Sequence, residues 1–206
     1  MDLFKRAGEG KCPPRRAVLG FGAAALALSG CGGREDSLAA QARAGDDKNY
    51  IAGDGSVNEY RPDARGSKVS LTGTLFSGET VSSEDWAGNA VVLNFWYAGC
   101  APCRKEAPDL VALNNEFRDQ GVLFYGVNVR DDAPTAAAFE RTFGVGYPSF
   151  DDSNGGILLA MTTYVPPRAV PTTLVLDREG RVSARILGIS EKGTLKALIV
   201  SALAGQ

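Results

Sequence analysis

The sequence predicts one α/β domain over residues 66–206, built on a sheet with a mostly parallel centre. Three observations lead to this prediction. A continuous apolar run at residues 90–97 is typical of a strand buried on both faces. Strand-like and helix-like stretches alternate after it, as they do in βαβ units. A late pair of strand-like stretches around a short turn then adds antiparallel strands before a final helix.

The first elements of the domain are expected to be short. Residues 69–72 alternate between apolar and polar side chains, which predicts a strand. The Ser77-Gly78 pair separates residues 74–76 from residues 79–81, and this pattern predicts a β-hairpin. The following Ser83–Trp86 stretch is predicted to be a capped helical turn.

The centre of the domain is predicted to be a βαβ unit. After the strand at residues 90–97, a helix is expected over residues 101–119, with Pro108 inside it and therefore a kink. The next strand is expected at residues 122–129. The apolar side chains of the helix recur near helical spacing, at Ala107, Leu110, Val111, Leu113 and Phe117.

The second half is predicted to begin with an α insertion. Pro134 opens a helix expected over residues 134–143, followed by a short strand at residues 147–150 and a short helix at residues 155–163. Two strands, at residues 172–176 and 181–187, flank an Asp-Arg-Glu-Gly turn. An amphipathic helix at residues 191–203 closes the chain.

The N-terminal segment resembles an export leader. A basic stretch precedes the apolar residues 17–29, which are too few to span a membrane comfortably. Leu28-Ser29-Gly30-Cys31 resembles the end of a bacterial lipoprotein signal, which implies that residues 1–30 are removed and that Cys31 carries lipid. A buried N-terminal helix is the alternative. The Arg15-Arg16 pair resembles a twin-arginine motif, so the export route stays open.

Residues 31–65 are predicted to be a flexible tether. This stretch is rich in small and charged residues and has no sustained apolar period. Four larger side chains in it are candidates for packing on the domain: Tyr50, Ile51, Val57 and Tyr60.

The composition excludes several classes of function. A formal net charge of −2 gives no sign of a nucleic-acid partner. The chain contains no histidine, which excludes histidine bases, Ser-His-Asp triads and histidine ligands to metal or haem. Cys12 lies in the predicted leader and Cys31 is the predicted lipid site, so Cys100 and Cys103 are expected to be the free thiols of the exported protein.

Cys100 and Cys103 lie where the central strand ends and the first long helix begins. Free backbone N–H groups and the helix dipole at that point favour a thiolate at Cys100. A purely structural disulfide would close only a tiny loop and restrain the unfolded chain little. A zinc site would need further ligands. We therefore predict a redox-active Cys100–Cys103 disulfide, with no metal and no other cofactor.

The motif WYAGCAPCRKEAP at residues 96–108 and the Val-Pro-Thr-Thr stretch about 70 residues later carry a family resemblance. They resemble the TlpA/ResA group of thioredoxin-like, membrane-tethered thiol–disulfide oxidoreductases, over about residues 67–204 and the leader. The resemblance implies a thioredoxin-like fold with an N-terminal β-hairpin extension and an α insertion between its βαβ and ββα halves.

The resemblance also implies roles for four residues. Cys100 would be the nucleophile and the more exposed cysteine, and Cys103 would resolve the mixed disulfide. Pro171 matches the cis-proline that lies beside the dithiol in this family, and Val170 would offer backbone groups to a bound peptide. An ordinary proline at the start of a strand is the alternative interpretation of Pro171.

Glu106 matches an acidic residue that lies close to the dithiol in the ResA branch. Partly buried, it would exchange protons with a thiol; a solvated helix charge is the alternative. Asn94 stands where thioredoxins place a buried aspartate. Gly99 stands where many relatives have tryptophan, which predicts a more open groove at Cys100. Trp96 is a candidate wall of that groove, although core packing is the favoured interpretation.

We therefore expect a monomeric thiol–disulfide oxidoreductase outside the cytoplasm, lipid-anchored to the outer face of a bacterial cell membrane. The resemblance favours reduction of exported disulfide-containing proteins, with apocytochrome c as a candidate and electrons from a membrane thiol–disulfide transfer protein. Oxidative protein folding is the main alternative. A peroxiredoxin-like peroxidase is less favoured, because Tyr97 replaces the threonine expected three residues before the cysteine. A copper-carrying or solute-binding lipoprotein is disfavoured by the lack of histidine and by a single mature methionine, Met161.

Overall fold

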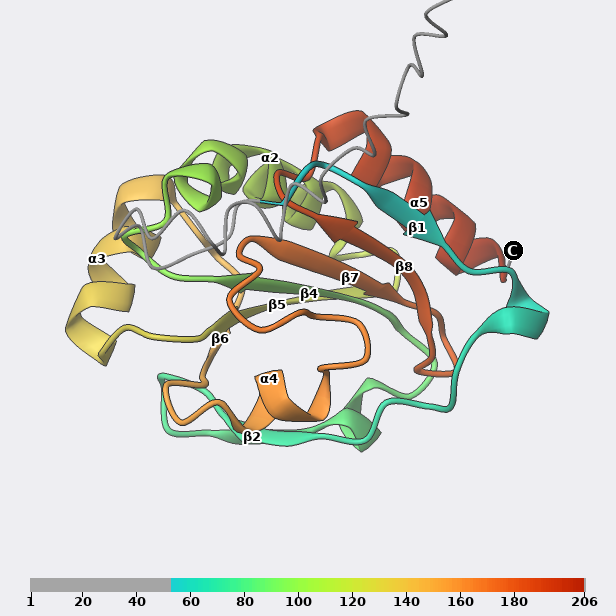
Figure 1. Cartoon of the computed structure of the whole chain (residues 1–206), viewed down its shortest axis with the longest axis horizontal. Helices are drawn as coiled ribbons and strands as arrows, with labels where there is room; N and C mark the ends of the chain where they lie inside the picture. The colour runs from blue at the N-terminus through green and yellow to red at the C-terminus, as the bar shows by residue number, and fades with distance from the viewer. Residues whose placement is uncertain (1–52, 206) are drawn as a thin grey trace, which may run out of the picture. The chain divides into compact units, whose positions relative to one another are not determined.

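The structure is a computed structural model that describes residues 53–205. This part of the chain forms a six-stranded mixed sheet with strand order β1-β8-β7-β4-β5-β6 (Figure 1). Its strands are β1 (Val57–Glu59), β4 (Ala90–Trp96), β5 (Val122–Asn128), β6 (Ser149–Asp151), β7 (Thr172–Leu176) and β8 (Val182–Leu187). The β4, β5 and β6 strands are parallel, whereas β7 pairs antiparallel with both β4 and β8. The predicted α/β fold with a parallel centre and a late antiparallel pair is confirmed.

Two long helices cover one face of the sheet: α2 (Ala101–Phe117) and α5 (Lys192–Ala204). Both lie on the same side of the strands in Figure 1. Their apolar side chains pack against alternate residues of the strands, including Ala90 and Val92 of β4. Successive side chains of a strand point to opposite faces of the sheet. Asn94 lies two residues after Val92, so it points to the same face and toward the helices. Each residue of β4 is buried, as predicted for a central strand.

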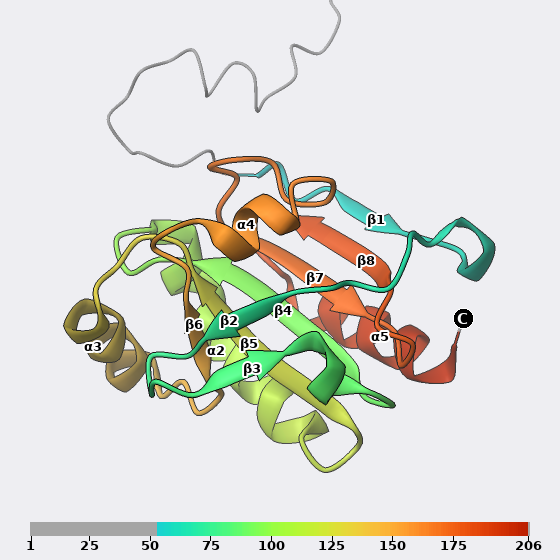
Figure 2. The same cartoon turned by 90° about the horizontal axis from the view of Figure 1, so that it is seen from below.

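The opposite face is covered by a β-hairpin and a short helix. The strands β2 (Thr72–Thr74) and β3 (Thr80–Ser82) pair antiparallel, and Figure 2 shows them lying across the sheet from that side. Gly78 makes the turn between them with a φ of 89°. The short helix α4 (Gly156–Ala160) and the 3-10 turn η2 (Ser83–Trp86) complete this layer. The predicted N-terminal hairpin and the capped turn are both confirmed.

The predicted insertion lies between the two halves of the fold. It contains α3 (Ala133–Phe143), β6 and α4, and it connects β5 to β7. Asp132 caps α3 by accepting a hydrogen bond from the Thr135 N–H, and Gly144 ends the helix in the left-handed conformation. The bounds differ from the predicted ones most clearly in α4, which is shorter than the predicted helix at residues 155–163.

The strand predicted at residues 69–72 is wrong. Val69 and Leu71 are buried, but β2 begins only at Thr72. Val69 donates its N–H to the Gly180 carbonyl and Leu71 donates to the Ser83 hydroxyl, so these residues join no ladder. The apolar alternation in this stretch therefore reflects burial of single side chains.

The folded part of the chain also begins before residue 66. Within the predicted tether, β1 pairs antiparallel with β8, and the 3-10 turn η1 (Pro62–Ala64) follows it. Arg65 then forms a buried ion pair with Asp177, with 3.0 Å between Nη1 and Oδ2. The side chains of β1 are exposed, so backbone pairing at the sheet edge holds it without an apolar pattern. Tyr50, Ile51 and the rest of residues 1–52 lie outside the described part of the chain.

Candidate active site

The two cysteines meet at the first turn of α2. The β4 strand ends at Trp96, and Cys100 is the N-cap of the helix that starts at Ala101. Its Sγ atom accepts a hydrogen bond from the Cys103 N–H at 3.2 Å. Cys100 and Cys103 are joined in a disulfide with their Cα atoms 5.3 Å apart. In a reduced site the same N–H and the helix N-terminus would stabilise a Cys100 thiolate.

Both cysteines are buried in this oxidised form. Cys100 is 0% exposed and Cys103 is 2% exposed, so the expectation that Cys100 is the more exposed cysteine is wrong here. Gly99 is exposed, but Cys100 beside it is fully shielded, and a groove more open than in relatives with tryptophan at this position stays a prediction. The cover comes from a cluster in which Tyr97 and Val170 pack with both cysteines.

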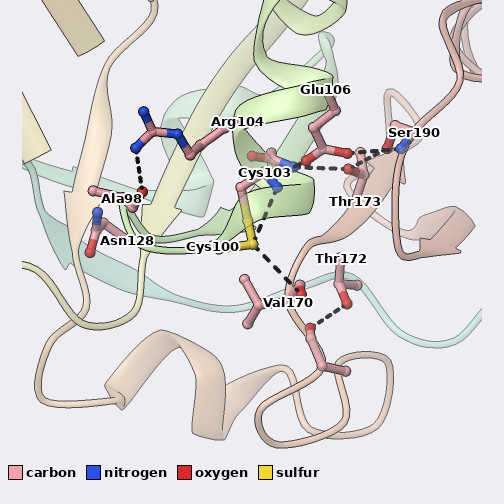
Figure 3. The surroundings of a disulfide bond; sticks show 12 residues. Ala98, Cys100, Cys103, Arg104, Glu106, Asn128, Val170, Thr172, Thr173 and Ser190 are labelled. Atoms are coloured by element: carbon pink, nitrogen blue, oxygen red, sulfur yellow. Dashed lines mark hydrogen bonds between the residues drawn. A yellow bond between two sulfur atoms is a disulfide. The ribbon is translucent and has the colours of Figure 1, made fainter. Parts of the chain in front are cut away.

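The loop that enters β7 closes over the disulfide. The Val170–Pro171 peptide bond is cis, as the resemblance implied. The carbonyl oxygen of Val170 lies 3.8 Å from the Cys100 Sγ, as Figure 3 shows. Thr172 holds the loop by donating its hydroxyl to the Ala169 carbonyl at 2.7 Å. Val170 therefore presents a backbone group directly at the reactive sulfur.

Trp96 lies in the core beneath the dithiol. It is 4% exposed, and its ring packs against Phe139 of α3 with 4.3 Å between centroids. It belongs to the same apolar cluster as both cysteines. This placement favours the core interpretation over a groove wall.

Glu106 is buried behind the disulfide on α2. It is 1% exposed, so the alternative of a solvated helix charge is wrong. Its Oε1 atom accepts a hydrogen bond from the Asn94 amide at 2.7 Å, and its Oε2 atom accepts from the Ser190 N–H at 2.8 Å. Burial raises the pKa of Glu106 from 4.5 to about 7, although the hydrogen bonds from Ser190 and Asn94 act in the opposite direction.

Two residues of the hydrogen-bonded group around this carboxyl could not be chosen from the sequence. Thr173 lies in the Val-Pro-Thr-Thr motif, and its Oγ1 atom accepts from Asn94 at 3.1 Å and from the Ser190 hydroxyl at 2.8 Å. Ser190 precedes α5 and stands 84 residues from Glu106 in sequence. The alternation of side chains along β4 predicts that Asn94 faces α2. Nothing in the sequence predicts that Ser190 reaches Glu106.

Polar and charged side chains contact the loop between β4 and Cys100. Asp131 accepts the Ala98 N–H at 2.6 Å and the Asn128 amide at 2.8 Å. Arg104 approaches the Ala98 carbonyl at 3.4 Å, as Figure 3 shows. The guanidinium of Arg130 lies 4.2 Å from the centre of the Tyr97 ring. Sequence reasoning singled out none of these contacts, and those of Asp131 with Ala98 and of Arg130 with Tyr97 join segments 33 residues apart.

Two other expectations concern metal and membrane. Within residues 53–205 no three Cys, Asp, Glu or His side chains gather as a metal site would require. In the same range, no helix is both long and apolar enough to cross a bilayer. The predicted lipid site, Cys31, lies outside the described residues.

Known proteins show similarity in both sequence and structure. A family profile described as "AhpC/TSA family" matches residues 65–185. The thiol-disulfide oxidoreductase ResA of Bacillus subtilis (strain 168) is 33% identical over 112 residues, which cover 54% of this chain and 60% of that protein. ResA of Geobacillus kaustophilus (strain HTA426) is 34% identical over 119 residues, covering 58% and 66%. The match thus spans about 60% of the length of such curated relatives.

Solved structures agree over nearly their whole length. A thiol:disulfide interchange protein of the thioredoxin family from Chlorobium tepidum TLS superposes with a TM-score of 0.62 at 30% identity, over 68% of this chain and 99% of that one. A DsbF homologue from Corynebacterium diphtheriae gives a TM-score of 0.64 at 31% identity, over 72% and 94%. The predicted thioredoxin-like fold and the resemblance to ResA are confirmed. The chain belongs to the AhpC/TSA family of thioredoxin-like proteins.

Proposed function

We propose that this protein is an extracytoplasmic thiol–disulfide oxidoreductase that acts through Cys100 and Cys103. The observation that carries the proposal is the disulfide at the N-terminus of α2, with the Val170 carbonyl 3.8 Å from the Cys100 Sγ. The thiolate-stabilising position of Cys100 and the nearby backbone group of Val170 are what exchange with a peptide disulfide requires. The ResA relatives are named thiol-disulfide oxidoreductases, which supports the same reaction.

The reducing direction proceeds in two steps. The Cys100 thiolate attacks one sulfur of a substrate disulfide, a mixed disulfide forms, and the other substrate sulfur leaves as a thiolate that takes up a proton. The Cys103 thiol then loses its proton and attacks the Cys100 sulfur. The second substrate thiolate leaves, and two electrons have moved from the dithiol to the substrate. Glu106 follows Cys103 by one helical turn and is the group we assign to accept the proton of Cys103.

The proposal includes the direction of electron transfer and the partner proteins. The family resemblance favours reduction of exported proteins, with apocytochrome c as the candidate substrate and a membrane thiol–disulfide transfer protein as the electron donor. We further propose that residues 1–30 are removed and that lipid on Cys31 anchors the protein. Labelling of cells with radioactive palmitate should mark the wild-type protein, whereas a Cys31→Ala variant should be unlabelled and released from membranes. Labelling of that variant would contradict the anchor.

A trapping experiment tests the reaction. In a Cys103→Ser variant the mixed disulfide on Cys100 cannot be resolved, so a substrate should remain covalently attached until a reductant is added. A Cys100→Ser variant is the matched control and should capture nothing. Equal capture by both variants, or none by either, would contradict the assigned roles.

Three measurements separate the competing reactions. Insulin reduction with a reduction potential well below that of strong oxidants, about −120 mV, supports the reducing direction. A potential near that value supports oxidative folding instead. Rapid turnover of hydrogen peroxide by the reduced protein would favour a peroxidase, although Tyr97 occupies the position expected for its threonine.

A further inference from the structure

Four buried polar residues form a cluster behind the dithiol. Glu106 of α2, Asn94 of β4, Thr173 of β7 and Ser190 before α5 are all at most 4% exposed. Figure 3 shows Glu106, Thr173 and Ser190 directed toward one another from these separate elements. Because water does not reach the cluster, each polar hydrogen and each oxygen in it needs a protein partner.

The hydrogen bonds of the cluster suit an ionised Glu106. The Asn94 Nδ2 atom lies 2.7 Å from Glu106 Oε1 and 3.1 Å from Thr173 Oγ1, so its two hydrogens serve two acceptors. The Ser190 N–H donates to Glu106 Oε2 at 2.8 Å. The Ser190 hydroxyl donates to Thr173 Oγ1 at 2.8 Å. Both carboxylate oxygens therefore face donors.

A protonated Glu106 does not suit this arrangement. If the proton sits on Oε2, its hydrogen meets the Ser190 N–H, which cannot accept, and the acceptor beside it is the Ser190 hydroxyl oxygen, whose own hydrogen goes to Thr173. If the proton sits on Oε1, its hydrogen meets the Asn94 Nδ2 hydrogen. A buried donor left facing another donor costs about 1–3 kcal/mol. The partner of Oε1 must therefore change when that oxygen takes up a proton.

Asn94 is the partner that can change. A half turn of its side-chain amide brings Oδ1 to the position of Nδ2, and an amide torsion of this kind has two similar minima. Oδ1 has two lone pairs. It then accepts a hydrogen from Glu106 Oε1 and another from the Thr173 hydroxyl, while Thr173 still accepts from Ser190.

We propose that Asn94 is a positioning residue whose side-chain amide turns over each time Glu106 gains or loses a proton. The proposal rests on the proposed function in one respect: the Cys103 thiol transfers its proton to Glu106 Oε1, which leaves a Cys103 thiolate and a neutral Glu106. Asn94 then gives Glu106 Oε1 a hydrogen-bond partner in both protonation states. Asn94 has no direct role at either sulfur and acts only through Glu106.

Glu106 is the residue of the cluster that gains and loses a proton near neutral pH. The pKa of Glu106 near 7 brings both of its states within reach of neutral pH. The negative charge of Asp109 on α2 raises the pKa of Glu106. Burial and the Glu106 charge raise the pKa of Tyr147, which lies before β6, further above neutral pH. Asn94, Thr173 and Ser190 do not titrate, and the cysteines of the oxidised protein have no proton to lose.

Nuclear magnetic resonance of the oxidised full chain tests the proposal directly. The side-chain amide signals of Asn94 should shift between pH 5 and 9 with the same midpoint as the Glu106 carboxyl carbon. Asn128 is the matched control, because its Oδ1 accepts the N–H groups of Arg130 and Asp131 and so cannot turn. Asn94 signals that stay constant while the Glu106 carbon titrates would overturn the proposal.

Two variants give a second reading. In Glu106→Gln the Asn94 signals should lose their titration; an unchanged midpoint would refute the link between the two residues. In Asn94→Ala the ionised Glu106 loses a donor, so its midpoint should rise by about one pH unit, a tenfold change in its acid dissociation constant. The control variant Asn115→Ala changes an exposed residue of α2, the helix that carries Glu106, and should leave the Glu106 midpoint unchanged.

The reduced protein links the cluster to the reaction. Asn94→Ala should shift the pH profile of thiol alkylation upward together with the Glu106 midpoint, and an unshifted profile would contradict its positioning role. Failure of the proposed function is distinguishable, because it would appear as absent insulin reduction by the wild type. The measurements on the oxidised protein do not depend on that activity.

Discussion

The buried carboxyl group of Glu106 makes the stability of the oxidised domain depend on pH. Burial raises its pKa from 4.5 to about 7 in the folded protein. Between these two values the folded state holds a proton that the unfolded state has lost. The contribution of Glu106 to the free energy of unfolding is therefore highest below pH 4.5, falls as the pH rises to 7, and is constant above it. At 1.36 kcal/mol per pH unit, the loss is about 3 kcal/mol.

The Glu106→Gln substitution isolates this effect. Glutamine keeps the shape of the side chain but cannot ionise, so the variant should lose the pH dependence that Glu106 causes. The difference in unfolding free energy between variant and wild type should change by about 3 kcal/mol in favour of the variant from pH 4 to pH 8.5. Contributions from other titrating groups cancel in that difference. Urea denaturation followed by circular dichroism, with the disulfide intact, measures it.

A matched control is available on the same helix. Asn115 is exposed on α2, and Asn115→Ala changes a surface side chain that does not titrate and lies outside the core. The pH dependence of the stability of this variant should run parallel to that of the wild type. If the Glu106→Gln curve is also parallel to the wild-type curve, the buried carboxyl group costs nothing to ionise, and the reasoning from its burial is refuted.

Three further changes test other parts of the structure. Arg65→Ala leaves Asp177 with one fewer partner in the interior and should lower the unfolding free energy by about 3 kcal/mol in a denaturant titration; a loss below about 1 kcal/mol would show that the pair is solvated. A chain that starts at residue 60 lacks β1 but keeps Arg65, and it exposes the β8 edge, so it should be less stable and more prone to aggregate than one starting at residue 53 in thermal unfolding and light scattering; equal behaviour would contradict the pairing. Val170→Ala trims the cover over Cys100 and should speed reduction of the disulfide by dithiothreitol in a stopped assay; an unchanged rate would show that the shield lies elsewhere.

The elements with strong local patterns were predictable from the sequence. The β4 run is apolar throughout because both of its faces are covered, and the cysteines after it mark the start of α2. The β7 strand has the predicted bounds because Pro171 and a turn limit it on either side. Such signals lie within a few residues of the element that they define, so a single sequence carries them.

The parts that depend on distant segments were not predictable. The β1 strand has exposed side chains, and it exists because the backbone of β8, more than 120 residues later, offers an edge. The burial of Cys100 depends on the loop at Val170, and that of Glu106 on Ser190. The family resemblance implied that Cys100 is the more exposed cysteine, but tertiary packing buries it completely.

One short segment lies beside both Cys100 and the cluster around Glu106. The register of the antiparallel β4–β7 pair places Asn94 opposite Thr173, and Thr173 joins the cluster around Glu106. Three residues earlier, Val170 covers Cys100 with its carbonyl group. An incoming thiol must displace this cover to reach the sulfur, and the displacement occurs at the end of the strand that holds Thr173. The four residues Val170 to Thr173 thus act as one unit of the site, so the Val-Pro-Thr-Thr motif is better understood as a whole than as a proline with neighbours.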